Sequence, residues 1–180
     1  MLEHKNSFMR TSNTALAKLK RSPYPAYTSL KVRIWQLRWY KNPKSRRGLI
    51  NDLKKQLVIV FRETEFPDQR FIWEIARSAS VCNAAEMRSF ISAVENAKEI
   101  DPWLKSMFIG KLKYSIAWRV RGDGFANEVS EKAWKTFYDL LDEAQVEFEN
   151  AMRIQPDFPE AATVAAFFHH LRWQFKSRRS

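Results

Sequence analysis

The sequence predicts an all-α protein of about six or seven helices that pair as antiparallel hairpins. Apolar residues recur every three or four positions along most of the chain, as on the buried face of a helix. Helix-capping residues precede most of these segments, and the connections between them are short. The 180 residues include only four Gly, which is too few turn residues for a β-sandwich or barrel of this length.

Two helices are expected in the first third of the chain. The first begins at Pro25 and ends before Pro43, because the residue before a proline is disfavoured in helical geometry. Ser45 is expected to cap the second helix, which ends before Pro67. The apolar stripes of these helices are Tyr27, Leu30, Ile34 and Leu37 in the first and Leu49, Ile50, Leu53, Leu57, Val60 and Phe61 in the second.

The middle of the chain predicts two shorter helices. Asp68 is a suitable N-cap for a third helix that ends near Ser80. Asn83 is expected to start a fourth helix, because Glu86 follows it at capping-box spacing. The residues expected to be buried are Phe71, Ile72, Ile75, Ala76 and Ala79 in the third helix and Met87, Phe90, Ile91 and Val94 in the fourth.

Three longer helices follow in the last part of the chain. Asp101 caps the fifth, and Gly122 ends it, because glycine readily takes the left-handed conformation of a helix C-terminus. Ser130 caps the sixth, and Asp157 starts a final helix that runs toward Phe175. Apolar or small residues share one face of each of the two longest helices: Trp103, Met107, Gly110, Tyr114, Ala117 and Trp118 in the fifth, and Trp134, Phe137, Tyr138, Leu141, Ala144, Phe148, Ala151 and Met152 in the sixth.

The sixth helix resembles the second helix of a tetratricopeptide repeat. Ala144, Phe148, Ala151 and Pro156 have the spacing of that helix and its closing turn, within the string FENAMRIQPDFPEAA. Small Ala side chains let neighbouring helices approach closely, Phe148 fills the space between them, and Pro156 turns the chain. The resemblance implies a short right-handed solenoid or bundle of helix pairs.

The first helix of this repeat departs from the family pattern. Glu131, Lys132 and Lys135 occupy the positions where a tetratricopeptide repeat has its first-helix Gly and Tyr. Gly110 and Tyr114 resemble those two residues but lie far upstream. The pair is therefore either an elongated variant of the repeat or an analogue of it, and no second copy is visible in the sequence.

A broader resemblance covers roughly residues 24–162. The runs YPAYTSL, DPWLKSMFIGKLKYSIAWRVRGDGFANEVSEKAWKTF and FENAMRIQPDFPEAA are similar to segments of an uncharacterised bacterial family of long tetratricopeptide-like proteins. That family implies helical repeats and supplies no known activity. It also implies that this chain is a short or truncated member, whose last helix caps the stack.

Charge divides the chain into segments. Residues 1–60 hold fourteen Lys or Arg against two acids, whereas residues 125–167 hold three against nine. Residues 1–22 have a basic, Ser- and Thr-rich composition that also resembles a mitochondrial presequence, although a disordered tail is the simpler interpretation. The predicted organisation is a disordered basic tail at 1–22, a basic helical subdomain at 23–99, a tetratricopeptide-like helix pair with a capping helix at 100–175, and a second basic tail at 176–180.

No constellation of residues predicts catalysis, a metal site or a cofactor. The single cysteine, Cys82, excludes an internal disulfide and is expected to be a buried thiol in a reducing compartment. His169 and His170 are adjacent, so their side chains diverge on a helix and cannot bind one metal together. Asp139, Asp142 and Glu143 are interpreted as a solvated helix face.

The loop after the fifth helix carries the remaining candidate for an anion site. Arg119, Arg121 and Asp123 lie beside two glycines, but the loop follows a helix, whereas dinucleotide fingerprints follow a strand. Pairing with local acids or with helix-end carbonyls is the simpler interpretation of these residues. A functional loop that meets an anionic ligand is the other.

Two functions remain, and neither involves catalysis. The first is a cytoplasmic tetratricopeptide-like scaffold for a protein or peptide partner, with no membrane span. The alternative is accessory binding of nucleic acid, because cations for phosphates alternate with aromatic rings for bases in one segment. The simpler interpretation of this segment is a basic helix face whose Trp side chains pack in the core and bind nothing. The segment contains the cations Lys31, Arg33, Arg38, Lys41, Lys44, Arg46 and Arg47 and the rings of Trp35, Trp39 and Tyr40.

Overall fold

Every regular element in the described part of the chain is helical, which confirms the predicted fold class at the level of all-α. The computed structural model describes residues 25–64 and 73–166. The predictions for both tails, for Asp68, Phe71 and Ile72, and for His169 and His170 lie outside these residues. The elements are α2 (Pro25–Gln36), η1 (Leu37–Trp39), α3 (Pro43–Glu63), α5 (Ile75–Ser78), η2 (Ala79–Val81), α6 (Ala84–Glu95), α7 (Pro102–Arg121) and α8 (Glu131–Ile154), followed by helical residues 159–166.

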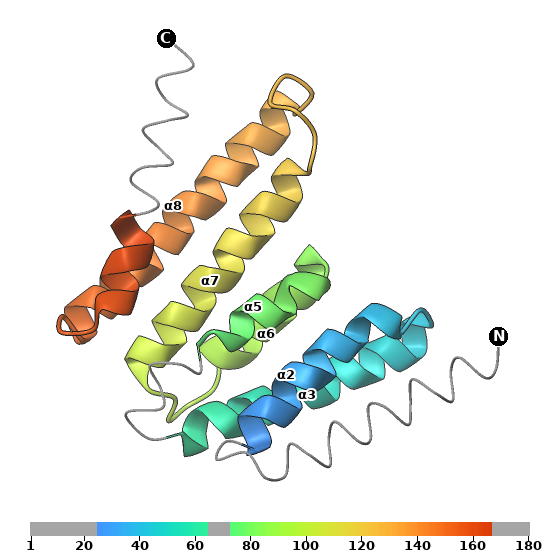
Figure 1. Ribbon diagram of the computed structural model, residues 1–180, viewed down its shortest axis with the longest axis vertical. Helices are drawn as coiled ribbons and strands as arrows, with labels where there is room; N and C mark the ends of the chain where they lie inside the picture. Colours follow the sequence, from blue (N-terminus) through green and yellow to red (C-terminus); the bar gives the residue numbers. More distant parts are fainter. Residues whose placement is uncertain (1–24, 65–72, 167–180) are drawn as a thin grey trace.

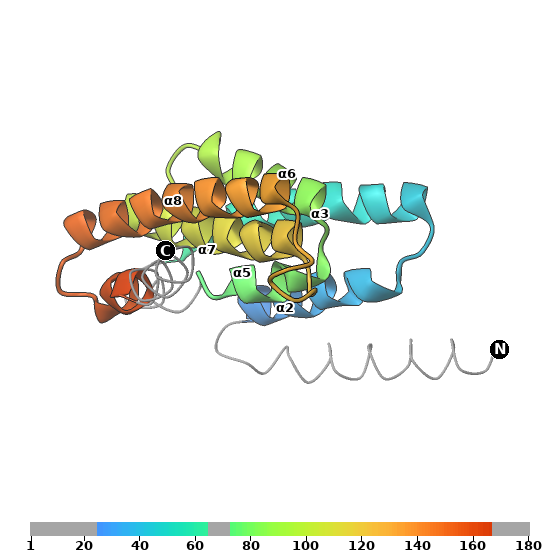
Figure 2. The ribbon, with the colours of Figure 1, turned by 90° about the horizontal axis from the view of Figure 1, so that it is seen from above.

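The helices lie side by side in chain order, from α2 and α3 at one end of the molecule to α8 at the other (Figure 1). Helix α2 contacts α3 and α5, α3 contacts α6, and α7 contacts α5, α6 and α8. Seen from above, α2 and α5 lie on one side of the molecule, and α3 and α6 lie on the other (Figure 2). One continuous apolar core joins all of these elements.

Four of the helix boundaries predicted from capping residues are confirmed. The Asn83 Oδ1 accepts from the Glu86 N–H, and the Asn83 N–H donates to the Glu86 carboxylate, both at 2.9 Å, which closes the expected capping box. Asp101 caps α7 at the Leu104 N–H, and Ser130 caps α8. Gly122 ends α7 at a φ of 77°, a left-handed value that glycine adopts at little cost.

Two predictions for the first half of the chain are corrected. Asn42 rather than Ser45 caps α3, because Pro43 holds Asn42 in an extended conformation from which its side chain accepts the Lys44 and Ser45 N–H groups. The first helix ends well short of Pro43, at Gln36, and continues only as the short 3-10 turn η1. Of the predicted third helix the structure describes only the end, as α5 and the 3-10 turn η2, which stop close to the predicted end near Ser80.

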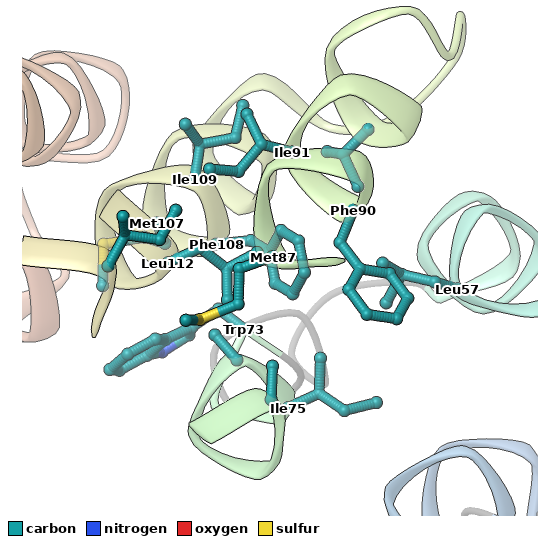
Figure 3. Packing of buried hydrophobic residues seen from close by; sticks show 14 of the residues in the cluster. Leu57, Trp73, Ile75, Met87, Phe90, Ile91, Met107, Phe108, Ile109 and Leu112 are labelled. Carbon is teal, nitrogen blue, oxygen red and sulfur yellow. The ribbon is translucent and has the colours of Figure 1, made fainter. Parts of the chain in front are cut away.

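The core fixes α6 between α3 and α7. Figure 3 shows Phe90 of α6 beside Leu57 of α3, and Met87 of the same helix beside Phe108 of α7. Phe61 of α3 and Phe108 also meet edge to face, with ring centroids 5.0 Å apart. Because these side chains are almost fully buried, the three helices behave as one packed body on which the surface residues are held.

Candidate functional site

The tetratricopeptide-like positions meet where α7 packs against α8. Ala144, Phe148 and Ala151 have no exposed surface. A Cβ atom on Gly110 would lie 3.0 Å from the Phe148 Cζ, so the absence of a side chain lets the two helices approach. Gly110 and Phe148 therefore lie in one interface between α7 and α8. Tyr114 is only half-buried, and Pro156 is exposed in the turn after α8.

Beyond this interface, cations and aromatic rings of α7, together with one ring of α8, form a row of contacts. Lys111 Nζ lies 4.8 Å from the Tyr114 ring centroid, and the Tyr114 and Trp118 rings meet edge to face at 6.2 Å. The Arg121 guanidinium lies over two indoles, 5.5 Å from the Trp118 centroid and 5.2 Å from that of Trp134. We call these five residues the cation–aromatic ladder. All five are partly buried, so their positions are held by packing while part of each side chain stays accessible.

The ladder continues onto α5 and α2. Burial lowers the pKa of Lys111, and the charge of Arg77 on α5 lowers it further. Burial raises the pKa of Tyr27 on α2, and the carboxylate of Glu74 beside α5 raises it further. Lys31 Nζ lies 5.2 Å from the Tyr27 ring centroid. Because α5 contacts both α2 and α7, the Lys31–Tyr27 and Lys111–Tyr114 pairs lie on neighbouring helices with Arg77 on the helix between them.

The aromatic rings of the basic segment face solvent, so their predicted packing in the core is wrong. The exposed fractions are 42% for Trp35, 56% for Trp39 and 40% for Tyr40. Ile34 and Leu37 occupy the buried side of this turn instead. The two Trp rings meet edge to face at a centroid distance of 6.3 Å, and the Arg38 guanidinium lies 5.7 Å from the Trp35 centroid.

The cations of this segment divide into two groups. Arg38, Lys41, Lys44 and Arg47 are exposed near these rings, and Lys31 and Arg33 are partly buried. Arg46 is drawn inward. Arg46 was predicted to contact an anionic ligand, but its guanidinium is already bound by protein groups, so its role here is structural.

Arg46 ties the start of α3 to α6 and η1. Its Nε and Nη2 donate to the two Glu86 carboxylate oxygens at 2.5 and 2.7 Å, and its Nη1 donates to the Leu37 carbonyl. Burial alone would raise the pKa of Glu86, but the hydrogen bonds from Arg46 and from the Asn83 N–H outweigh burial and lower it. Glu86 thus serves both the capping box and the ion pair, and the two bonds to Arg46 fix its plane.

The other candidates for chemistry show structural contacts. Cys82 is fully buried, as predicted, and burial raises the pKa of its thiol to about 12. Glu143 lies 3.5 Å from Lys113 Nζ, which also contacts Glu147 at 3.0 Å. In the loop after α7, Arg121 donates to the Gly122 carbonyl, as the simpler interpretation expected. Within residues 25–64 and 73–166, no three His, Cys, Asp or Glu side chains cluster in a way that would hold a metal ion.

The ladder is the feature that the sequence reasoning missed. Lys111, Tyr114, Trp118 and Arg121 follow each other at helical spacing, but the apolar stripe assigned Tyr114 and Trp118 to the core and left the charges unassigned. A cation three or four residues from each ring was the available signal.

Comparison with protein-family models, with curated proteins and with solved structures finds no match for this chain. Among the helices that the structure describes, none combines the length and the apolar content that crossing a membrane would need. The residues and their contacts therefore carry the functional argument.

Proposed function

We propose that this chain is a non-catalytic, cytoplasmic helical scaffold that binds an acidic peptide segment of a protein partner along α2, α5 and α7. The observation that carries the proposal is the cation–aromatic ladder on α7 and α8 and its continuation through Arg77 and Lys31. The proposed fold is a short tetratricopeptide-like solenoid, in which α2, α5 and α7 form one layer of the stacked helix pairs.

The contacts between helices support this solenoid. Helix α5 contacts both α2 and α7, and α3 contacts α6. Neighbouring hairpins that touch through equivalent helices are what a solenoid requires. The close approach of α7 and α8 at Gly110 and Phe148 matches the physics of the tetratricopeptide pair, in which small residues let the helices pack tightly.

The chemistry of the ladder favours an acidic partner. Tyr, Trp and Arg are the residues that contribute most to protein interfaces, because they bury a large area and retain a polar group. Arg121 lies over two indoles, so part of the entropy of ordering its side chain is already lost before a ligand arrives. Along this row the cations are Lys31, Arg77, Lys111 and Arg121, of which Arg77 lies 3.8 Å from the Glu74 carboxylate.

Selection from a random peptide library tests the proposal. We expect peptides rich in Asp and Glu to be enriched on the wild-type protein. The double variant Lys111→Gln/Arg121→Gln is expected to lose at least about tenfold in affinity for them, as for the loss of two charged contacts. A matched control is Lys55→Gln/Arg88→Gln, which removes two exposed cations from α3 and α6.

Two results would count against this function. One is enrichment of peptides without acidic residues. The other is equal loss of affinity in the control variant, which would indicate general attraction by the net charge of +11 rather than recognition by the ladder. Circular dichroism of both variants establishes that the helices remain folded.

A further inference from the structure

The proposed scaffold function leaves one prominent surface unused, at the corner between α2 and α3. We define the α2–α3 corner as the exposed rings of Trp35, Trp39 and Tyr40 and the exposed cations Arg38, Lys41, Lys44 and Arg47. It lies at the turn between α2 and α3, at the edge of the molecule (Figure 1).

The charge of the α2–α3 corner is of one sign. No Asp or Glu occurs between residues 25 and 51. The fold brings Glu86 of α6 to this segment, but both of its carboxylate oxygens are occupied by Arg46. The four exposed cations are therefore not neutralised by acids of their own segment, and their field attracts a polyanion.

The aromatic rings select the kind of polyanion. An exposed ring can stack on a nucleic-acid base, and stacking tolerates any base because each has a flat aromatic face. Bases within a duplex already stack on one another, so only an unpaired strand offers its base faces to Trp35 and Trp39. The two rings are inclined by 70°, so each would take a base from a different direction, and the strand would bend around the corner.

The corner is also held rigidly, which favours binding by a small surface. The Arg46 pair with Glu86 and its bond to the Leu37 carbonyl fix the residues on both sides of the turn. The Asn42 cap fixes the first turn of α3. A ligand therefore meets side chains whose backbone is already ordered, which reduces the entropic cost of association.

An anionic membrane surface is the competing ligand for exposed Trp and basic residues. Interfacial helices bury a continuous apolar face in the lipid. Leu30, Ile34 and Leu37, the apolar face of this segment, are at most 2% exposed because they belong to the protein core. The exposed rings of Trp35, Trp39 and Tyr40 therefore do not extend into an apolar helix face that could enter lipid, whereas stacking on bases needs only the rings.

We propose that the α2–α3 corner binds single-stranded nucleic acid, with Arg38, Lys41, Lys44 and Arg47 on the phosphates and Trp35 and Trp39 on the bases. This activity is separate from the acidic-peptide site along the ladder.

Titration of a fluorescent single-stranded oligonucleotide of about 15 nucleotides tests the inference, because bound strands in such sites span about 4–16 nucleotides. We expect the logarithm of the affinity to fall with the logarithm of salt concentration at a slope of up to about −3, as four cations meet a single strand. Trp39→Ala is expected to weaken binding by about fivefold or more, and Trp39→Phe to retain most of it. Because Trp39 is 56% exposed, neither variant should unfold the protein.

Control variants and ligands separate this site from general charge attraction and from the peptide site. Lys132→Gln/Lys135→Gln and Lys111→Gln/Arg121→Gln are both expected to bind the oligonucleotide within about twofold of wild type, since α7 and α8 lie away from the α2–α3 hairpin (Figure 1) and screened charges far from the strand contribute little. A duplex of the same sequence is expected to bind at least about tenfold more weakly.

Three outcomes would overturn the inference. The first is a duplex that binds as tightly as the single strand. The second is an unchanged affinity in Trp39→Ala. The third is preferential binding, lost in Trp39→Ala, to vesicles containing phosphatidylserine or to an acidic peptide. If the oligonucleotide binds while the acidic peptides do not, binding of nucleic acid at the α2–α3 corner is supported and the scaffold proposal is refuted.

Discussion

Replacing Gly110 with Ala tests how closely α7 and α8 must approach. In an open helix the change would stabilise the protein by about 1 kcal/mol, because glycine is the poorer helix former. Here the new Cβ atom would lie 3.0 Å from the Phe148 Cζ and 3.1 Å from the Glu147 Cβ. Phe148 is fully buried and has little room to move, so overpacking should cost about 1–3 kcal/mol.

The difference between these two effects predicts a net loss of about 1 kcal/mol for Gly110→Ala. In a Phe148→Leu background, Gly110→Ala should instead stabilise the protein, because the ring atoms nearest to the new Cβ atom are then absent. The helix can then shift by the few tenths of an ångström that the Glu147 contact still requires. We therefore expect a coupling of about 1–2 kcal/mol between the two positions.

Urea unfolding followed by circular dichroism measures these free energies, with an unchanged m-value as the sign that only stability has changed. Gly48→Ala is the matched control. Gly48 also lies within a helix, α3, but nothing is within 4 Å of its added Cβ, so about 1 kcal/mol of stabilisation is expected. Stabilisation by Gly110→Ala in the wild-type background, equal to that at Gly48, would refute the close approach.

Two pH-dependent predictions concern α6 and the turn before it. Because the pKa of Glu86 is lowered from 4.5 in the folded state, its pair with Arg46 stabilises the protein above that value and loses this contribution as the pH falls through the lowered pKa. Glu86→Gln should cost about 2 kcal/mol at pH 7 and less at acidic pH, whereas an equal cost at both would contradict the assignment. Burial raises the pKa of Cys82 from 9.0 to about 12, so below about pH 9 its thiol is protonated in both states and contributes no pH dependence. Between pH 9 and 12 the unfolded chain releases the proton first, so the free energy of unfolding should fall by up to about 4 kcal/mol. Urea unfolding of the wild type and of Cys82→Ala across this pH range measures the fall, which should be smaller in the variant.

The fold class and several helix boundaries were predictable because the interactions that set them are local. Asn83 and Glu86 are three residues apart, and so are Asp101 and Leu104, so each cap can be recognised in a short stretch of sequence. The start of α3 was misplaced by three residues because Ser45 and Asn42 are both good caps. Pro43 decided between them by holding the residue before it in an extended conformation.

The candidate sites were less predictable, because exposure depends on which side of a helix finds a partner. Trp35 and Trp39 have the apolar character of core residues, but Ile34 and Leu37 take the positions that face α3 and α5. Arg46 and Arg47 are adjacent and chemically identical. One is paired with a residue forty positions away and the other is exposed, and no feature of the segment itself distinguishes them.

Local sequence patterns were sufficient to show that the chain forms helices and where most of them begin and end. Hydrogen bonds and side-chain periodicity within a few residues are sufficient for that. Which rings and cations remain on the surface, and which ones meet across helices, depends on how the helices pack. Those contacts join residues far apart in the chain, and they are set by how the helices pack to bury the largest apolar area.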